Sequence, residues 1–310
     1  MGTELAARGF SLEAPLFSAR ALIDAPELVE QIHFDYLLAG AQVLTTNSFG
    51  LHASTLARAG IGQQQDALIG RALEIIENVR RRALAHDRRL ARFRVAGSIP
   101  PRPHEDLNLA AAIGRAEYRA YADRLARAGA DLILLETFTT IAEIALAVDG
   151  ACTVGELEGL PIWLSVAAGA PPASGGSRPD GTRLIDGDPL AELAPFVERV
   201  DGLLINCTQI DAVPAAIDSL LAVAGDAPLA LGLCPHLGKR RHDGVWINRI
   251  IDPEVFAEQM HAWLRARPSI SLAGACCGSQ PDYTAAMREI LQPDSATRER
   301  AWTRLAEIVP

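Results

Sequence analysis

Short runs of apolar residues recur along the chain, and segments with apolar positions at helical spacing separate them. Each run is near-continuously apolar over about one strand length, as expected for parallel strands that are covered on both faces. The runs lie at 42–48, 93–99, 131–137, 161–167, 201–207, 227–234 and 270–276. Helical patterns lie at 108–128, 139–150, 211–224 and 253–266. This alternation predicts βα units and a parallel sheet.

The rhythm of seven strands predicts a (β/α)8 TIM barrel whose first strand is missing from the N-terminus. Residues 1–5 already have the pattern of the loop and helix that follow a first strand. A doubly wound open sheet would tolerate seven strands and is the alternative fold, although no Gly-x-Gly-x-x-Gly follows the first strand. No stretch of shifted composition divides the chain, so we expect residues 1–310 to form one barrel domain. An unpaired edge beside the last strand would favour a homodimer.

The composition argues against several classes of protein. The chain has 310 residues, 49% of them hydrophobic, which is enough for a sizeable core. A formal net charge of -9 argues against a nucleic-acid partner, because phosphates bind to basic surfaces. No apolar run approaches the ~20 residues that span a membrane. Five cysteines, two of them adjacent, make a poor disulfide framework. We therefore expect a reducing cytoplasm, where cysteine clusters serve as metal sites or nucleophiles.

Three cysteines lie at the ends of predicted strands. Cys207 ends the strand at 201–207, and Cys276 and Cys277 end the strand at 270–276. The carboxyl ends of barrel strands open onto one rim, where active sites are built, so the three side chains can converge. Three thiolates supply three positions of a tetrahedral zinc shell, and a catalytic zinc keeps the fourth open. The sequence therefore predicts a zinc ion held by these three cysteines.

Adjacent side chains on a regular strand point to opposite faces, so both sulfurs of the Cys276–Cys277 pair can face inward only if the backbone turns. Gly274 and Gly278 flank the pair and allow such a turn. Cys152 and Cys234 are expected to be small buried residues, because free cysteine is among the most buried residue types. Two further segments, 170–187 and 235–249, are expected to form loops on the same rim.

Asn206-Cys207, followed downstream by Gly-Ala-Cys276-Cys277-Gly, resembles the zinc signature of the homocysteine S-methyltransferase family. Weaker matches follow in the family's order: Met-Gly-Thr-Glu-Leu at 1–5, His33-x-x-Tyr36, Thr45-Thr46-Asn47-Ser48-Phe49, Val95-Ala96-Gly97-Ser98 and Leu134-Leu135-Glu136-Thr137. The resemblance implies zinc-dependent transfer of a methyl group from a sulfonium donor, S-methylmethionine or an S-adenosylmethionine-like molecule, to the thiolate of homocysteine. The product would be methionine.

The resemblance also implies substrate contacts. It assigns Glu136, at the end of its strand, to the ammonium group of the substrate. Thr46 and Asn47 end another strand, and we expect them to form part of the substrate pocket. The chain departs from the family in lacking the usual Asp-Gly-Gly before Met-Gly-Thr. It also has Pro235-His236 where the family usually has Pro-Asn, and His236 is a candidate for contact with the donor.

The charge of the predicted centre suits this chemistry. Zinc binding ionises a thiol whose pKa is otherwise near ~8.5, and three protein thiolates keep the bound sulfur nucleophilic. A positively charged donor is attracted to the same negative centre. Two alternatives remain open at this stage. One is a methyltransferase for another small thiol or selenol, and the other is a degenerate, non-catalytic zinc-binding barrel.

Overall fold

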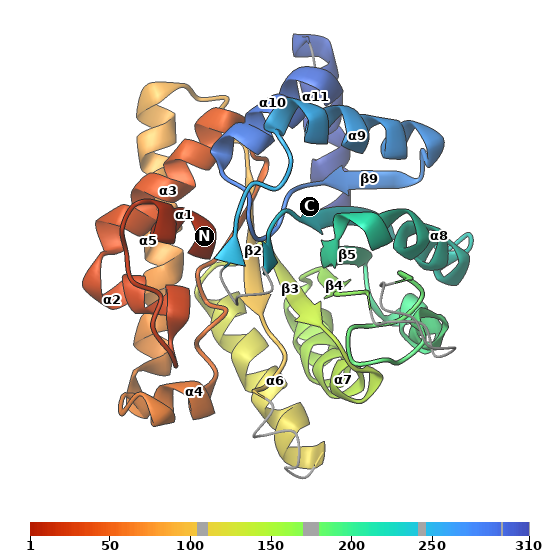
Figure 1. The fold of residues 1–310 in the computed structure, drawn as a ribbon. Helices are drawn as coiled ribbons and strands as arrows, with labels where there is room; N and C mark the ends of the chain where they lie inside the picture. The colour runs from red at the N-terminus through yellow and green to blue at the C-terminus, as the bar shows by residue number, and fades with distance from the viewer. Residues whose placement is uncertain (104–110, 170–179, 241–245, 293, 310) are drawn as a thin grey trace.

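A parallel sheet of seven strands, curled around a central axis, organises the chain in the computed structural model (Figure 1). The structure describes residues 1–103, 111–169, 180–240, 246–292 and 294–309. The strands are β1 (Val43–Thr45), β2 (Arg94–Ile99), β3 (Leu132–Phe138), β4 (Ile162–Val166), β5 (Gly202–Gln209), β6 (Ala230–His236) and β9 (Ile270–Ala273). All seven coincide with predicted strands.

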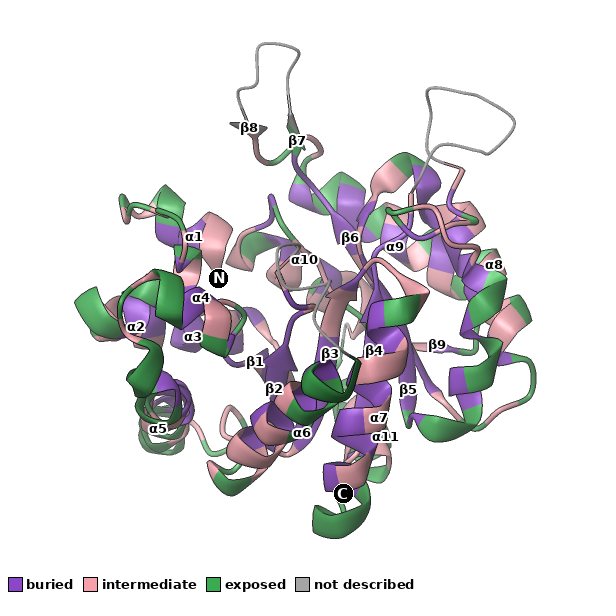
Figure 2. Ribbon diagram, turned by 90° about the horizontal axis from the view of Figure 1, so that it is seen from below, coloured by how far each residue is buried: buried purple, intermediate pink, exposed green. Residues whose placement is uncertain are grey.

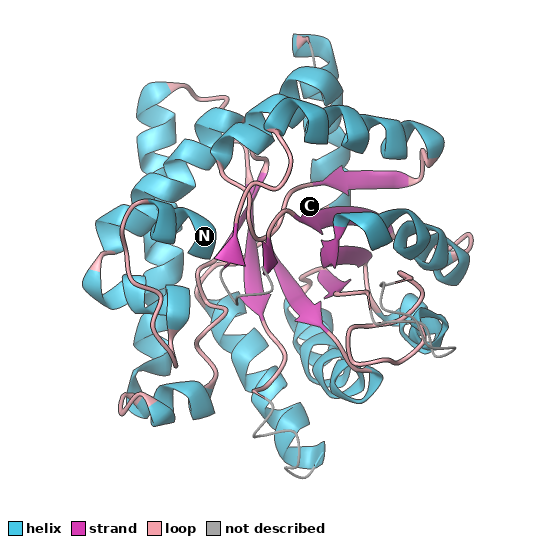
Figure 3. Cartoon of the chain, in the orientation of Figure 1, coloured by secondary structure: helices cyan, strands magenta, loops and turns pink. Residues whose placement is uncertain are grey.

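Helices surround the sheet (Figure 3). They are α1 (Gly2–Ala7), α2 (Ala21–Asp24), α3 (Pro26–Ala39), α4 (Ala53–Arg58), α5 (Gln65–His86), α6 (Ala111–Arg127), α7 (Ile141–Glu158), α8 (Val213–Ala224), α9 (Pro253–Ala266), α10 (Pro281–Leu291) and α11 (Ser295–Ile308). Four of them confirm predicted helices. The helix predicted at 139–150 continues to Glu158 and includes Cys152, which is buried as expected. None of the described helices combines the length and hydropathy that a membrane span needs.

The order of the strands distinguishes the two predicted folds. Neighbours in the sheet follow sequence order, β1-β2-β3-β4-β5-β6-β9, and every pair is parallel. A doubly wound sheet reverses its strand order at a switch point and carries helices on both faces. The sequential order and the outer helical layer confirm a barrel-like fold (Figure 1). Among the described residues, β1 and β9 are the edges of the sheet, which agrees with the predicted count of seven strands.

The helical layer continues across the side on which the sheet is open. Helices α3 and α10, which flank the two edge strands, pack against each other. The Arg288 guanidinium in α10 donates to the carbonyl of Leu38 in α3 at 3.0 Å. Gly40 ends α3 with φ 109°, and a Cβ there would lie 2.4 Å from Cδ of Arg288. The left-handed turn therefore favours glycine at this helix end, and the Arg288 side chain packs over it.

The inside of the curled sheet has its own small core. The inward side chains of successive strands form it with two residues from the end of the chain: Ala96, Leu132, Leu134, Trp163, Leu204 and Ala230 with Leu305 and Val309. Because Arg94, the first residue of β2, donates from Nε to the Val309 carbonyl at 2.7 Å, α11 lies at the amino ends of the strands. The hairpin of β7 (Lys239–Arg240) and β8 (Trp246–Ile247) lies at the opposite end (Figure 2).

The two predicted rim loops are described in part. Residues 170–179 and 241–245 lie outside the described residues. Of the first loop, Arg183 and Leu184 form isolated bridges with Pro189 and Ala168. In the second loop, Pro235 and His236 belong to the end of β6, and the β7–β8 hairpin follows. The carboxyl ends of the strands are thus the rim that carries these segments.

Candidate metal centre

Cys207 projects from an irregularity near the end of β5. The pairing of β5 with β6 shifts register between Asn206 and Gln209, and Cys207 has φ 48°, in the left-handed region. A bulge of this kind turns one side chain away from the regular alternation of a strand. The strand was predicted to end at Cys207 but continues to Gln209. The bulge, and not the strand end, therefore orients this thiol.

Cys276 and Cys277 lie beyond β9, which ends at Ala273 and not at residue 276 as predicted. Backbone hydrogen bonds to the end of β6 fix the segment: the Cys276 N–H donates to the Pro235 carbonyl at 2.8 Å, and the Leu237 N–H donates to the Cys277 carbonyl at 2.7 Å. Gly278 has φ 88°, and a Cβ there would lie 2.3 Å from the Leu237 carbonyl carbon. The turn that follows the cysteine pair therefore requires glycine at residue 278.

The three predicted thiols meet at the rim. The Sγ of Cys207 lies 2.7 Å from that of Cys276 and 3.7 Å from that of Cys277, and Cys276 and Cys277 are separated by 4.0 Å. Zinc–sulfur bonds of about 2.3 Å in a tetrahedron place two sulfurs about 3.8 Å apart. Two of the three separations match that edge. The shortest one, between Cys207 and Cys276, is well below that edge, and metal binding would have to widen it.

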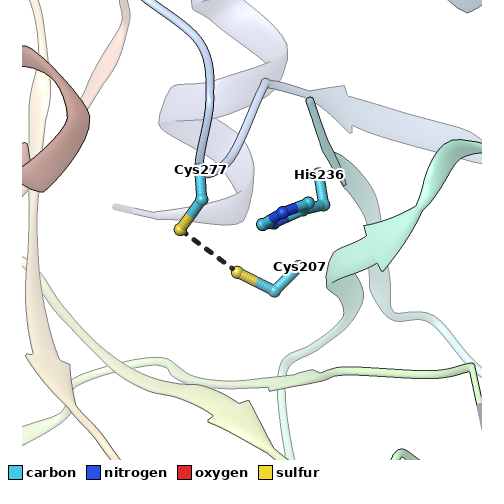
Figure 4. A group of neighbouring side chains, drawn as sticks. All are labelled: Cys207, His236 and Cys277. Carbon is cyan, nitrogen blue, oxygen red and sulfur yellow. Dashed lines mark hydrogen bonds between the residues drawn. The ribbon is translucent and has the colours of Figure 1, made fainter. Parts of the chain in front are cut away.

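His236 joins the same group from the end of β6 (Figure 4). One ring nitrogen of His236 and the Sγ atoms of Cys207 and Cys277 all lie within 4.8 Å of one another, a spacing that could hold a metal ion. The imidazole is buried, with 7% of the residue exposed. His236 is not among the ligands predicted from sequence. Its position at a strand end on the cysteine-bearing rim is the signal that could have identified it.

Contacts within the group favour the ionised form of one of the three thiols. Hydrogen bonds from the thiols of Cys207 and Cys276 lower the pKa of Cys277, and interaction with His236 lowers it further. The pKa of Cys276 is raised because this thiol is hydrogen-bonded to the other two sulfurs and is buried. Of the three thiols, Cys277 is therefore the one whose ionised form these contacts favour. A thiolate, and not a thiol, is the form that binds a metal.

Glu136 lies on the same rim, at a second irregularity of the sheet. The pairing of β3 with β4 shifts between Leu135 and Phe138, and Thr137 has φ 67°. The Ser98 hydroxyl donates to Oε2 of Glu136 at 2.7 Å. Burial raises the pKa of this carboxyl group, although the hydrogen bond from Ser98 opposes the effect. Glu136 is thus a half-buried acceptor near the cysteine group.

Asn206 links the two irregular strands. Its Nδ2 donates to the Thr137 hydroxyl at 2.7 Å, and its Oδ1 accepts a hydrogen bond from the Ser165 hydroxyl at 2.8 Å. The same Nδ2 lies 4.0 Å from the Sγ of Cys276. The buried amide therefore connects the bulge that follows Glu136 with the bulge that carries Cys207.

Thr46 and Asn47 follow β1 on this rim and are buried. The Thr46 hydroxyl accepts the Ser98 N–H at 3.0 Å. Asn47 Nδ2 donates to the Ser18 carbonyl at 2.8 Å. Both side chains thus hold neighbouring segments in place, and Thr46 shares with Glu136 the partner Ser98.

The chain resembles known proteins along most of its length. The family model described as homocysteine S-methyltransferase matches residues 1–291. The homocysteine S-methyltransferase of Escherichia coli (strain K12) is 29% identical over 304 residues, which cover 93% of this chain and 92% of the relative. The selenocysteine methyltransferase of Astragalus bisulcatus is 27% identical over 319 residues, 94% of this chain and 90% of the relative.

Solved structures agree with the sequence relatives. The metallated form of the E. coli homocysteine methyltransferase MmuM superposes with a TM-score of 0.75 at 27% identity, covering 93% of each chain. The oxidised form of the same enzyme gives a TM-score of 0.75 at 28% identity, covering 94% of this chain and 93% of that one. The barrel of this chain is therefore similar to that of an enzyme that has been crystallised with metal bound.

Proposed function

Because this chain belongs to the homocysteine S-methyltransferase family, we propose that it transfers a methyl group from a sulfonium donor to the thiolate of homocysteine, giving methionine. The observation that supports this most strongly is the convergence of three thiols, from two separate strand ends, within 4.0 Å of one another. Such a group can ionise a substrate thiol only through a metal, and the related MmuM has a metallated form.

We infer that the metal is zinc. Thiolates are soft ligands that favour zinc among the common divalent ions, and the spacing of the sulfurs is close to a tetrahedral edge. When bound, zinc would supply the positive charge that keeps the homocysteine sulfur ionised at neutral pH. Cys207, Cys276 and Cys277 are the residues that would hold it. Their excess negative charge leaves the substrate sulfur strongly nucleophilic and attracts a positively charged donor.

Glu136 is the proposed anchor for the ammonium group of homocysteine. Its carboxylate is half-buried on the rim, so an ammonium group bound there would meet less competition from water than on the open surface. Ser98 donates to only one of its oxygens, which leaves acceptor capacity on the other. Thr46 and Asn47 are proposed to shape the pocket beside it, since they fix the segment that follows β1.

Among donors, we propose that S-methylmethionine is used better than betaine. A quaternary ammonium group is best bound by a cage of aromatic faces, each worth up to ~2 kcal/mol when desolvated. Aromatic residues make up only 5% of this chain. After β1, Phe49 is followed by Gly50, where betaine users are expected to supply a tyrosine. A sulfonium amino acid can instead be held by polar groups through its carboxylate and ammonium.

A donor panel with zinc-loaded protein and homocysteine tests this function. We expect methionine to form with S-methylmethionine at a higher kcat/KM than with betaine. Cys207→Ser should lose bound zinc and activity together, because a neutral hydroxyl is a far poorer ligand than a thiolate. Cys152→Ser is the matched control: this thiol lies in α7 and donates to the Arg199 carbonyl at 3.0 Å, a bond that serine can also make. Full zinc and full activity in Cys207→Ser would falsify the proposal.

A second acceptor class follows from one relative. The selenocysteine methyltransferase of Astragalus bisulcatus is about as similar to this chain as several homocysteine enzymes are. Including selenocysteine and other small thiols in the same panel tests whether this chain prefers another acceptor. Zinc binding with no transfer to any acceptor would instead indicate a non-catalytic barrel.

A further inference from the structure

We propose that Thr3, in helix α1, is a positioning residue for the metal centre, because its hydroxyl holds the turn that carries Cys276 and Cys277. The inference rests on the proposed function, since it assumes a metal bound by these cysteines. It assigns a role to the Met-Gly-Thr-Glu-Leu motif at residues 1–5, which the proposed chemistry does not use. In this role Thr3 acts through the backbone of the turn and binds neither metal nor substrate.

The contact between α1 and the turn is a hydrogen bond to the residue that follows the cysteine pair. The N–H of Gly278 donates to Oγ1 of Thr3 at 2.9 Å. Gly278 is buried, so this N–H is shielded from water and needs an acceptor from the protein. The next residue, Ser279, is also buried and donates its hydroxyl to the Cys276 carbonyl at 2.7 Å. A shift of the Gly278 peptide would therefore displace Cys277, which precedes it.

A second group of hydrogen bonds, from the segments after β6 and after the β7–β8 hairpin, fixes the carbonyl groups of the turn. The Leu237 N–H donates to the Cys277 carbonyl at 2.7 Å, and the Arg249 N–H donates to the Gly278 carbonyl at 3.0 Å. Neither bond involves the N–H of Gly278. Without the Thr3 hydroxyl, this N–H would lose the acceptor that the structure shows for it.

Charged side chains fix α1, and with it Thr3, beside α3. Glu4 is only 5% exposed and accepts a hydrogen bond from Nε of Arg8 at 2.8 Å. Arg8 also donates to Asp35 of α3 at 2.6 Å. The second oxygen of Glu4 accepts from Nε2 of Gln280, just beyond the turn, at 3.1 Å. Helix α1 is therefore attached both to the outer helical layer and to the cysteine-bearing segment.

A second sequence motif, His33-x-x-Tyr36 in α3, meets the same turn. Tyr36 interacts with both Glu4 and Ser279: burial raises the pKa of its phenol, the Glu4 carboxylate raises it further, and a hydrogen bond with Ser279 opposes both effects. Two of the weaker sequence matches thus converge on the segment that carries Cys276 and Cys277. We infer that they support the metal centre from outside its ligands.

The rate of zinc release tests this role without measuring activity. Thr3→Val keeps the branching of the side chain but removes the acceptor, whereas Thr3→Ser keeps the hydroxyl. We expect Thr3→Val to release zinc to a chelator about tenfold faster than the wild type, and Thr3→Ser to stay within about twofold of it. Thr303→Val is the matched control and should behave as wild type, because the Thr303 hydroxyl donates within α11 to the Glu299 carbonyl.

Amide hydrogen exchange, measured by mass spectrometry, gives a second readout. In the metal-free proteins, residues 274–280 should exchange faster in Thr3→Val than in Thr3→Ser, because exchange follows local opening. In the wild type, zinc should slow exchange in α1 as well as in the turn, since energetic coupling between two sites is reciprocal. This wild-type measurement uses no variant, so it decides the question even if Thr3→Val fails to fold.

Several results would overturn the role of Thr3 and leave the proposed function intact. One is equal zinc release by Thr3→Val and Thr3→Ser, and another is zinc that protects the turn but leaves α1 unchanged. Equally fast release from Thr303→Val would likewise show that the effect does not depend on the contact with the turn. A wild-type protein that binds no zinc would instead contradict the proposed function itself.

Discussion

Among the non-glycine residues with left-handed backbone conformations are two beside or within the candidate site, Thr137 with φ 67° and Cys207 with φ 48°. Such conformations are uncommon, and for a β-branched residue such as threonine they cost of order 1–3 kcal/mol. Surrounding interactions must therefore hold them, and Asn206 contacts the Thr137 hydroxyl directly. Thr137 is adjacent to Glu136, and Cys207 is itself a proposed metal ligand. These two backbone conformations thus set the directions of the Glu136 and Cys207 side chains.

The first prediction at this scale concerns Glu136. In Glu136→Gln, the shape of the side chain and an acceptor for the Ser98 hydroxyl remain, but the negative charge is lost. A hydrogen bond to a charged group contributes about 1.5–3 kcal/mol. We therefore expect the KM for homocysteine to rise by about tenfold to a hundredfold while zinc content stays at the wild-type level. Steady-state kinetics and metal analysis of the same preparation check this. An unchanged KM would remove Glu136 from substrate binding.

At the scale of elements, a buried ion pair joins the segment after β2 to the helices α6 and α7. The Arg102 guanidinium donates to Glu143 of α7 at 2.8 and 3.0 Å, and both side chains are at most 5% exposed. Tyr118 of α6 donates to the same carboxylate. Breaking a buried pair by removing one charge leaves the other uncompensated and is strongly destabilising. This cluster therefore fixes two outer helices relative to the sheet.

Glu143→Gln should lower the free energy of unfolding by about 3 kcal/mol at pH 7. Burial alone would raise the pKa of Glu143, but hydrogen bonds from Arg102 and Tyr118 outweigh burial and lower it from 4.5. A lowered pKa means that the carboxylate stabilises the fold above about pH 4.5 and that this contribution is lost as pH falls through the lowered value. The difference between variant and wild type should thus narrow below pH 4.5.

Urea unfolding of both proteins over a series of pH values measures this difference. Glu299→Gln is the control, because Glu299 pairs with Arg92 on the surface, where an ion pair contributes about 0–1 kcal/mol. A loss of stability in Glu143→Gln no larger than in the control would show that the buried pair is not needed.

At the scale of the whole molecule, the two ends of the barrel differ in structure. The carboxyl ends of the strands carry the cysteine group, and α11 covers the amino ends (Figure 2). Helix α11 begins at Ser295, beyond residue 291, where the match to the family model stops. Leu305 of this helix and Val309 just after it pack into the interior core of the sheet. The predicted homodimer, which would use the unpaired edge beside the last strand, β9, stays a prediction.

Leu305→Ala should therefore destabilise the protein by about 2–4 kcal/mol, because it leaves a cavity in the interior core. The zinc content of the folded protein should not change, since the cavity lies at the end away from the metal centre. Thermal unfolding and metal analysis check both parts. Leu157→Ala is the control: this leucine is 70% exposed on α7 and should tolerate the change. Loss of zinc from folded Leu305→Ala would show that the two ends are coupled.

The approximate strand positions, the barrel class, the family and the convergence of three cysteines could all be predicted from the sequence. Continuous apolar runs mark strands that are buried on both faces, and this signal is local. Parallel strands in a barrel place their carboxyl ends on one rim whatever the details of packing, so residue type and strand-end position were enough to bring Cys207 together with Cys276 and Cys277.

The tertiary structure alone decided how the rim is arranged. The bulges at Thr137 and Cys207 and the end of β9 at Ala273 depend on pairing between strands, which apolar runs do not encode. His236 reaches the sulfurs because the shifted register of β6 against β5 places it opposite Gln209. The cover formed by α11 likewise depends on contacts between residues far apart in the chain. Such features follow from long-range packing, which sets side-chain directions only once the sheet has formed.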